Sequence, residues 1–160
     1  MTTITPCLWF DTRAEEAAEF YTSIFKNSRI LEVSRYGEAG RREAGTVMTV
    51  AFELDGQPFV ALNGGPQFTF SEAISFQLPC ASQEEVDRYW EAFGEGGEHG
   101  PCGWVKDRFG VSWQVFPRRL IDLLRESDAE AGERVTEAML KMGRMDLAAL
   151  ERAAAAPAGA

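Results

Sequence analysis

The residue types that most often perform chemistry in proteins are sparse in this chain. The only histidine is His99, and the three cysteines, Cys7, Cys80 and Cys102, are far apart and form no Cys-x-x-Cys motif. A zinc site needs about four nitrogen, sulfur or oxygen ligands in compatible positions, which this set does not supply. An odd number of widely spaced cysteines is typical of reduced thiols, not of a disulfide framework. We therefore predict no metal and no cofactor.

Cys7 is a candidate nucleophile. A catalytic thiolate needs a neighbouring histidine or another cation that lowers its pKa. His99 is distant in the sequence, within the glycine-rich stretch 94–100. An inert, packed thiol is therefore the preferred interpretation for Cys7, and equally for the other two cysteines.

Two acidic pairs, Glu15-Glu16 and Glu84-Glu85, resemble paired catalytic carboxylates. Each pair lies at the start of a predicted helix. Thr12 with Glu15, and Ser82 with Glu85, have the spacing of a capping box. Capping and complementarity to the helix dipole explain these acids better than catalysis does.

The elements that position the remaining polar residues repeat along the chain. Apolar residues with helical spacing occur twice, as Ala17, Phe20, Tyr21, Ile24 and Phe25, and then as Val86, Tyr89, Trp90 and Phe93. A strand with one apolar face precedes each helix. In the first strand Ile4, Leu8 and Phe10 alternate with Thr5, Cys7 and Trp9; in the second Ile74, Phe76 and Leu78 alternate with Ala73, Ser75 and Gln77. This alternation indicates half-buried strands under amphipathic helices.

Further strands follow each helix. After the first helix we predict strands at 29–36, 46–54 and 58–63, the last two joined by an Asp55-Gly56 hairpin turn. After the second helix we predict strands at 102–106 and 111–116, joined by a turn at 107–110. The sequence thus predicts two copies of a βαβββ pattern.

We predict an α+β fold in which two tandem βαβββ modules, about residues 1–65 and 71–117, form a curved mixed sheet with a concave pocket. The run Gly64-Gly65-Pro66 marks the boundary between the modules. Residues 118–154 form a predicted C-terminal helical extension, and 155–160 a frayed tail. The extension covers the chain's own core or, alternatively, contacts a second subunit.

The strand faces turned away from the helices are predicted to line a small-molecule pocket. The residues assigned to it are Cys7, Trp9, Phe59, Asn63, Ser75, Gln77, Ser112, Gln114 and Phe116. Aromatic rings among them suit stacking on a planar ligand, and the amides suit orienting its polar atoms. The alternative is that these residues only fill the interface between the modules. Buried amides without a ligand would then each need a hydrogen-bond partner.

Four segments together resemble the PhnB-like branch of the vicinal-oxygen-chelate (glyoxalase/bleomycin-resistance) superfamily, whose members often carry the label demethylubiquinone methyltransferase-like. The segments are Ile4-Thr5-Pro6-Cys7-Leu8-Trp9-Phe10-Asp11 running on to Phe20-Tyr21, Ala61-Leu62-Asn63-Gly64-Gly65-Pro66, Gln83-Glu84-Glu85-Val86-Asp87-Arg88-Tyr89-Trp90, and 102–114. The resemblance extends from the start of the chain through Pro117. It implies the paired-module fold and, in many relatives, a homodimer.

In the metalloenzymes of this superfamily, four inward-facing side chains, usually His and Glu, hold a divalent metal. The matching positions by strand phase are Thr5 (or its neighbours Pro6 and Cys7), Ala61, Ala73 and Gln114. None of them supplies an imidazole or a carboxylate, the donors that such a metal requires. The resemblance therefore implies the fold without its usual metal.

The charge and composition of the chain limit the kinds of partner that it is expected to bind. The chain has 160 residues and a formal net charge of −9, which disfavours binding to nucleic acid or to an anionic membrane surface. No apolar stretch approaches the roughly 20 residues that span a bilayer. The N-terminal residues lack the basic and apolar regions of an export signal. We expect a cytoplasmic protein with a small-molecule ligand.

Three functions stay open. The first is metal-independent small-molecule binding, and the second is an enzyme acting on a small aromatic or quinone-like substrate. The third is an interaction module that uses the C-terminal helices. Methyl transfer with a nucleotide cofactor is disfavoured, because the glycine-rich stretch 94–103 follows a helix and does not join a strand to a helix.

Overall fold

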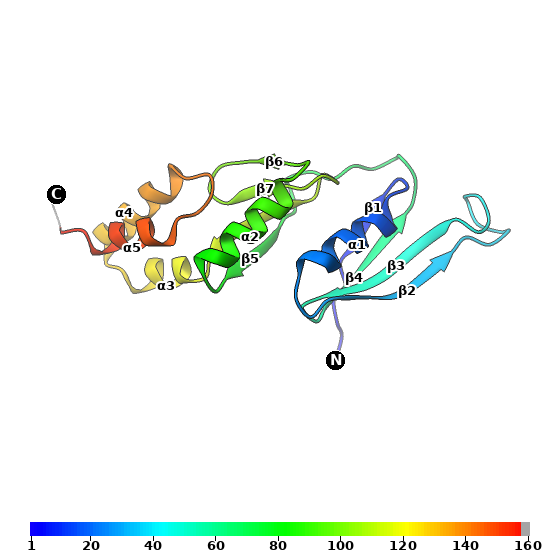
Figure 1. Cartoon of the computed structure of the whole chain (residues 1–160), viewed down its shortest axis with the longest axis horizontal. Coiled ribbons are helices and arrows are strands. Elements are labelled where there is room, and N and C mark those ends of the chain that lie inside the picture. Colours follow the sequence, from blue (N-terminus) through cyan, green and yellow to red (C-terminus); the bar gives the residue numbers. More distant parts are fainter. Residues whose placement is uncertain (158–160) are drawn as a thin grey trace. The chain divides into compact units, whose positions relative to one another are not determined.

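The computed structural model describes residues 1–157 and divides the chain into two compact units, Met1–Phe70 and Ser71–Ala160. In each unit one helix packs on one face of a four-stranded mixed sheet, and the second unit also carries three C-terminal helices (Figure 1). The predicted α+β fold and the two βαβββ modules are confirmed. The expected curved sheet consists of two separately hydrogen-bonded sheets, one in each unit.

The first sheet has the strand order β1-β4-β3-β2. Its elements are β1 (Cys7–Phe10), α1 (Ala14–Ile24), β2 (Arg29–Arg35), β3 (Val47–Leu54) and β4 (Gln57–Asn63). β1 pairs in parallel with β4, and the other two pairings are antiparallel. Asp55 and Gly56 join β3 to β4 with φ values of 46° and 81°, so the predicted two-residue hairpin turn is confirmed.

α1 covers this sheet with its small and aromatic residues. Ala14, Ala17 and Tyr21 of the helix are fully buried. The Tyr21 ring stacks on Phe52 of β3, which stacks in turn on Phe59 of β4. The core of the first unit therefore lies between α1 and strands β3 and β4.

The second sheet repeats the topology with the order β5-β8-β7-β6. Its elements are β5 (Phe76–Cys80), α2 (Gln83–Gly94), β6 (Glu98–His99), β7 (Trp104–Lys106) and β8 (Ser112–Pro117). Trp113 of β8 stacks on Phe93 of α2 with 4.5 Å between ring centroids, as its predicted helix-facing phase requires. Ile74, which we expected under the helix, precedes β5 and is 64% exposed, so that assignment is wrong.

The two helix starts differ in how they are capped. Ser82 Oγ accepts a hydrogen bond from Glu85 N at 3.2 Å, which confirms the predicted N-cap of α2. The predicted Thr12 cap of α1 is wrong, because Arg13 occupies the N-cap position without a side-chain bond to the helix. Asn63, at the end of β4, accepts the Ala14 N–H instead.

Three short helices follow the second sheet, and they pack mainly on one another. They are α3 (Arg119–Glu126), α4 (Ala129–Leu140) and α5 (Leu147–Ala155). Asp146 accepts the Ala149 N–H and caps α5, as the sequence predicts. Gln83 of α2 donates to Met145 O and accepts the Leu147 N–H, which ties the start of α5 to α2. Of the predicted tail, residues 158–160 lie outside the described part of the chain.

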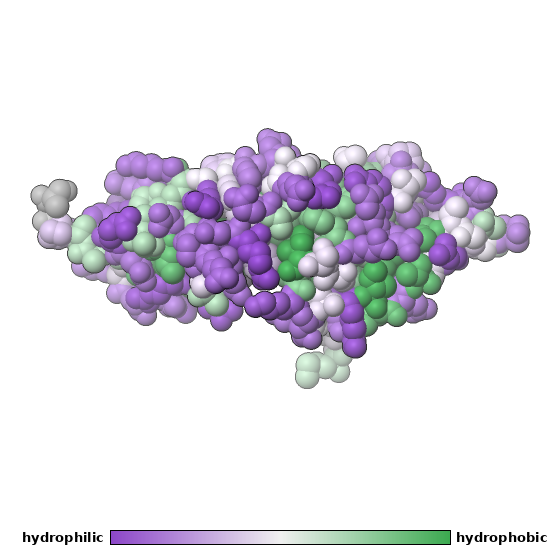
Figure 2. Space-filling view, in the orientation of Figure 1, coloured by the Kyte–Doolittle hydropathy of each residue, from purple (hydrophilic) through white to green (hydrophobic). Residues whose placement is uncertain are grey.

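The surface includes an apolar area on the first unit. Figure 2 shows hydrophobic surface over β2 and β3, where Leu31 and Val33 are exposed by 49% and 37%.

No helix in residues 1–157 combines the length and the hydropathy that a membrane crossing requires.

One glycine in α4 offers a test of the helix assignment. A Cβ built on Gly132 meets no atom within 4 Å, and this residue has an ordinary helical environment. Gly132→Ala is expected to raise the free energy of unfolding by about 0.5–1 kcal/mol, because alanine loses less backbone entropy in a helix. Urea denaturation measures the change. Gly103→Ala is the contrasting variant: its Cβ would lie 2.3 Å from Val115 O, so it should be destabilised.

Candidate functional site

Within the first unit, no helix covers the face of the first sheet opposite α1. On β1, Leu8 and Phe10 are buried towards the helix, whereas Trp9 is half-buried and lies on the other side. Trp9 pairs with Leu62 of β4, so these two residues share the open face. The predicted phase of β1 is confirmed.

The predicted phase of β4 is wrong. Phe59 and Asn63 were assigned to the open face, but both are only 6% exposed and lie on the α1 side of the sheet. Phe59 belongs to the aromatic stack under α1, and Asn63 caps that helix. The open face of β4 carries Val60 and Leu62 instead.

A large open pocket of about 1140 Å³ lies at the carboxyl ends of β1 and β4. We call it the first-unit pocket. Its walls come from the start of α1, the β2–β3 loop and the segment after β4. They comprise Trp9, Asp11, Thr12, Glu15, Tyr36, Arg41, Arg42, Glu43, Thr46, Val47, Leu62, Asn63, Gly64, Gly65, Pro66, Gln67 and Phe68. Of the sequence-predicted site residues, this pocket brings Trp9 and Asn63 together.

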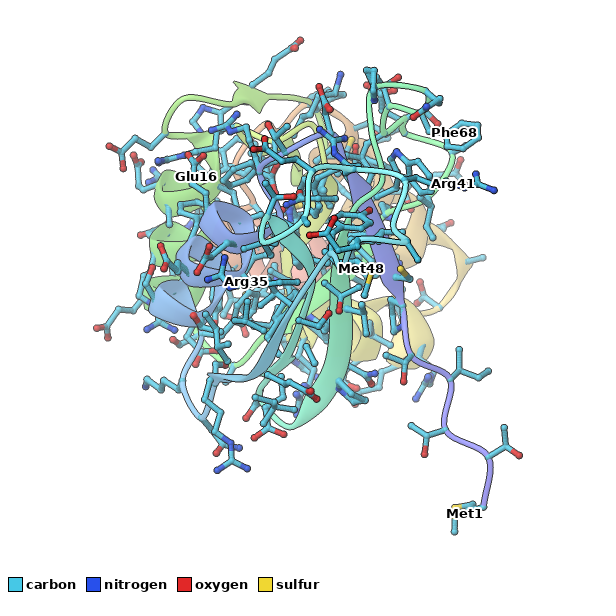
Figure 3. The ribbon with its side chains drawn as sticks, turned by 90° about the vertical axis from the view of Figure 1, so that its right-hand side faces the viewer. Met1, Glu16, Arg35, Arg41, Met48 and Phe68 are labelled. Atoms are coloured by element: carbon cyan, nitrogen blue, oxygen red, sulfur yellow. The ribbon has the colours of Figure 1, made fainter. Side chains whose placement is uncertain are left out.

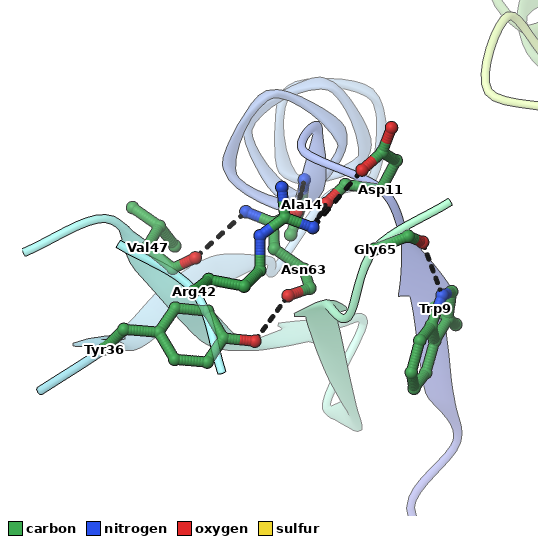
Figure 4. A network of polar contacts seen from close by, with 8 residues as sticks. All are labelled: Trp9, Asp11, Ala14, Tyr36, Arg42, Val47, Asn63 and Gly65. Atoms are coloured by element: carbon green, nitrogen blue, oxygen red, sulfur yellow. Dashed lines mark hydrogen bonds and ion pairs between the residues drawn. The ribbon is translucent and has the colours of Figure 1, made fainter. Parts of the chain in front are cut away.

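Asn63 organises the base of this pocket (Figure 4). Its Oδ1 accepts the Ala14 N–H at 2.8 Å, and its Nδ2 donates to Val47 O at 3.2 Å. Its backbone oxygen accepts the Tyr36 hydroxyl at 2.6 Å. Because both ends of the amide already have partners in the chain, Asn63 positions α1, β3 and Tyr36 and is not free to orient a ligand.

Trp9 forms a fixed aromatic wall. Its Nε1 donates to Gly65 O at 2.8 Å, and its ring lies directly on Gly64, where a Cβ would come within 2.3 Å of Cζ2. The ring of Phe68 meets Trp9 edge-on, with 5.0 Å between centroids. Phe68 is 65% exposed and lies at the same end of the first unit as Arg41 in Figure 3. An aromatic side chain this exposed leaves room for a second ring to stack against it.

The side chains that line the pocket carry more negative than positive charge. Arg42 Nη1 donates to Asp11 O at 3.0 Å and pairs with the Asp11 carboxylate at 3.3 Å. Arg41, Glu15 and Glu43 also line the pocket, and their charged groups make no ion pair within residues 1–157. After the Arg42–Asp11 pair, two carboxylates face one guanidinium.

The second sheet likewise has a face that α2 does not cover. Gln114 of β8 donates from Nε2 to Ser75 Oγ at 2.8 Å and pairs in register with Gln77 of β5. Ser112 and Phe116 share this phase of β8 and are exposed by only 2% and 9%. The predicted phase of β8 is thus confirmed. That the two open faces form one concave pocket stays a prediction.

The thiols and the histidine lack the features of catalytic groups. Burial raises the pKa of the Cys7 thiol, and burial together with the Glu85 charge raises the pKa of Cys80 to about 12. Both shifts favour the neutral thiol at neutral pH. The His99 ring stacks on Trp90 with 4.4 Å between centroids, and its Nε2 lies 3.0 Å from Trp90 O. Cys102 Sγ contacts Met139 O at 3.5 Å.

The four positions matching the superfamily's metal ligands do not fit a divalent ion. Ala61 is fully buried under α1 and has no donor atom. The amide of Gln114 is engaged with Ser75, and the Cys7 thiol is held neutral by its raised pKa. Ala73 contributes no donor side chain. Within residues 1–157, no three His, Cys, Asp or Glu side chains form a group suited to a metal.

Several residues of the first-unit pocket were not predicted from the sequence. Tyr36 and Arg42 belong to the β2–β3 segment, which the sequence marks only as a strand end and a polar loop. Phe68 follows the Gly64-Gly65-Pro66 run and was treated as part of a linker. An aromatic residue two positions after the glycine-rich turn is the one local signal that could have indicated this wall.

Comparison with known proteins places these features in a family. Residues 2–116 match the family model described as 3-demethylubiquinone-9 3-methyltransferase. A solved structure from Bacillus cereus, described as a putative 3-demethylubiquinone-9 3-methyltransferase, PhnB protein, is 37% identical and covers 71% of this chain and 97% of its own, with a TM-score of 0.63. No curated protein matches the chain.

Of two more distant solved structures, the first shares the fold. Protein PA1353 from Pseudomonas aeruginosa is 21% identical over 71% of this chain and 95% of its own, with a TM-score of 0.60. The fosfomycin resistance protein FosX from Listeria monocytogenes is 18% identical over 71% of this chain and 89% of its own, with a TM-score of 0.46. The match to the family model covers well over half of the chain. The chain therefore belongs to the PhnB-like, 3-demethylubiquinone-9 3-methyltransferase family.

Proposed function

We propose that the protein binds a small, planar organic molecule without a metal, and that the first-unit pocket is its site. The observation that carries this proposal is the aromatic wall, in which Trp9 is held flat by Gly64 and Gly65 next to the exposed ring of Phe68. A wall fixed before binding lowers the entropic cost of ordering side chains around a ligand.

The dimensions and lining of the pocket support a ligand of this kind. Its volume of about 1140 Å³ is slightly above the roughly 300–1,000 Å³ that is usual for small-molecule sites. Trp9, Leu62 and Phe68 supply apolar and aromatic surface, and the charged side chains lie around them.

The charge of the pocket favours a neutral or cationic ligand over an anion. Glu15 and Glu43 outnumber Arg41 once the Arg42–Asp11 pair is set aside. An anionic ligand would lose its hydration shell next to two carboxylates. A neutral phenol, catechol or quinone-like ring meets no such penalty.

An enzyme acting on a quinone-like ring is the second candidate, because the family model and the Bacillus cereus relative carry a demethylubiquinone methyltransferase description. A catechol probe separates the two functions. A binding protein takes up catechol and leaves it unchanged, whereas a methyltransferase supplied with S-adenosylmethionine converts it to 2-methoxyphenol. Chromatography of the incubated mixture distinguishes these outcomes.

Fluorescence of Trp9 tests binding. Trp90 and Trp113 are buried, so in a Trp104→Phe variant Trp9 is the main accessible indole. Catechol and 2-methoxyphenol are expected to quench this emission with a dissociation constant on the order of 0.1–1 mM, a normal affinity for so small a ligand.

The Trp9→Phe/Trp104→Phe variant is the matched control and should lose the response. Benzoate, an anion of similar size, should bind at least about 10-fold more weakly, a difference of about 1.4 kcal/mol. Equal quenching in both variants, or tighter binding of benzoate, contradicts the proposal.

A homodimer is expected from the family resemblance, and the C-terminal helices offer a surface for it. Ile121, Leu124 and Leu140 are exposed by 38%, 41% and 63%. Light scattering at micromolar concentration should give twice the chain mass, and Leu124→Glu with Leu140→Glu should shift it towards the monomer. A monomer mass for the unmodified protein across this range contradicts the expectation.

A further inference from the structure

The three C-terminal helices are an addition to the family domain. The family match ends at residue 116, before α3 begins, and 71% of this chain covers 97% of the Bacillus cereus relative. α3, α4 and α5 pack mainly on one another. These helices lie outside the matched part of the chain, so their surface is not a property of the family fold.

The exposed face of α3 combines basic and apolar residues. Arg118, at the N-cap, and Arg125, in the last turn, are seven residues apart, and Ile121 lies between them on the same side of the helix. All three are exposed, and neither arginine makes an ion pair within residues 1–157. Leu124, which is 41% exposed, flanks them.

The exposed face of α4 has the opposite charge. Glu130, Glu133 and Glu137 follow one another along one side of the helix, and Leu140, which is 63% exposed, continues the row. The three carboxylates are exposed and make no ion pair in the described part of the chain. Arg134 of the same helix is turned away from them and donates to two carbonyl groups at the end of α5.

The two faces keep opposite signs when every charge on them is counted. Two arginines against Asp122 leave the α3 face with one positive charge. Three glutamates against Lys141 leave the α4 face with two negative charges. Each copy of the chain has a net charge of −9, so two copies repel one another unless opposite signs meet locally. A second copy carries both faces and therefore complements both at once.

We propose that the exposed face of α3 in one copy packs against the exposed face of α4 in a second copy, and the reverse, about a two-fold axis. Such a contact uses the same patch on both copies. Arg118 and Arg125 are as far apart as Glu130 and Glu137, about 10.5 Å along a helix, so the two rows of charge match in length. The exposed apolar side chains of both helices are then removed from water. This pairing rests on the homodimer expected above and names the surfaces that meet.

Charge reversal separates this contact from other modes of association. Arg118→Glu with Arg125→Glu makes the α3 face acidic, and Glu133→Arg with Glu137→Arg makes the α4 face basic. We expect a dimer dissociation constant at least about 30-fold higher for each variant, because two charged positions in each of the two contacts change from attraction to repulsion. Light scattering at micromolar concentration should give the dimer mass for the unmodified protein and the monomer mass for each variant.

An equimolar mixture of the two variants is the decisive sample. One copy is then acidic on both helices and the other is basic on both, so both contacts across the axis become attractive again. The mixture should recover the dimer mass, and added salt should weaken that dimer and the unmodified one. Glu19→Arg with Glu38→Arg is the matched control: both residues are exposed on the first unit, and the same change in net charge should leave the dimer intact.

Three results would overturn the proposal. A dimer mass for either reversed variant would place the dimer contact elsewhere in the chain, while the expected homodimer itself would stand. A monomer mass for the mixture, with circular dichroism and Tm of both variants unchanged, would show that these charges do not decide the contact. A monomer mass for the unmodified protein would exclude the contact altogether. Ligand binding by the first-unit pocket is measured separately by Trp9 fluorescence, so its failure is distinguishable.

Discussion

Asp107→Ala is expected to lower the free energy of unfolding by about 3–5 kcal/mol, the largest stability effect of any variant considered. Asp107 is a carboxylate that is only 3% exposed. Its Oδ1 accepts the Phe109 and Val111 amides at 2.8 and 3.1 Å, and its Oδ2 accepts Trp113 Nε1 at 2.9 Å. Alanine would leave these donors buried without an acceptor.

The loss of stability in Asp107→Ala should affect the core of the second unit as well as the turn at residues 107–110. Trp113 is 2% exposed and stacks on Phe93 of α2, so the indole that Asp107 orients also joins the helix to the sheet. Urea denaturation followed by near-UV circular dichroism reports both effects. Loss of the Trp113 signal before global unfolding would locate the damage in this core.

Asp107→Asn and Asp128→Ala calibrate the result. Asparagine retains one oxygen for the two backbone amides but presents an amide N–H to the indole N–H, so a smaller loss of about 1–3 kcal/mol is expected. Asp128 is exposed and caps α4 through the Ala131 N–H, and its removal should cost about 1 kcal/mol. If Asp107→Ala costs no more than Asp128→Ala, the carboxylate does not stabilise the core.

Local patterns in the sequence were sufficient for most elements. The Asp55-Gly56 turn was predicted because both of its residues tolerate positive φ, which both adopt. The stripe ending in Phe93 predicted α2, and one-sided alternation predicted that Trp113 faces it. In each case the physical cause acts within a few residues, so a single sequence contains it.

The phase of β4 could not be predicted in this way. Its sequence, Gln57-Pro58-Phe59-Val60-Ala61-Leu62-Asn63, is apolar on both faces, so alternation does not distinguish them. The parallel pairing of Leu8 with Ala61 decides the phase, and that contact joins segments far apart in the chain. A strand that is apolar on both faces needs its partner before its faces can be assigned.

The predicted cap of α1 was wrong for a related reason. Thr12 and Glu15 have the spacing of a capping box, but Asn63 Oδ1, from the end of β4, satisfies the Ala14 amide. A residue 49 positions away leaves no trace in the local pattern. The same asparagine bonds Val47, and its backbone accepts the Tyr36 hydroxyl, so the missed cap and the missed pocket wall have one origin.

Gly64→Ala is expected to remove most ligand binding in the first-unit pocket while leaving the protein folded. An alanine Cβ would lie 2.3–2.4 Å from Cζ2, Cε2 and Cη2 of Trp9, closer than real atoms approach. Gly64 does not have the left-handed backbone that favours glycine, so the conflict is with the indole alone. The ring must move, which breaks its bond to Gly65 O.

The measurable consequences are a red shift of Trp9 emission, an unfolding free energy lower by about 1–3 kcal/mol and catechol binding weaker by at least about 10-fold. Gly37→Ala is the matched control in the same unit, because a Cβ there meets nothing within 4 Å. It should alter neither emission nor binding. Unchanged catechol affinity in Gly64→Ala would show that the Trp9 wall is not part of the site.

A double-mutant cycle isolates the contact. In a Trp9→Leu background the added methyl of Gly64→Ala has no indole to displace, so it should cost less than about 0.5 kcal/mol. The difference between the two backgrounds then measures the Trp9–Gly64 coupling directly. Binding should stay weak in the double variant although stability recovers, because leucine fills space but offers no flat ring to a planar ligand. Recovery of both stability and binding would assign the pocket's affinity to shape alone and would contradict a stacking role for Trp9.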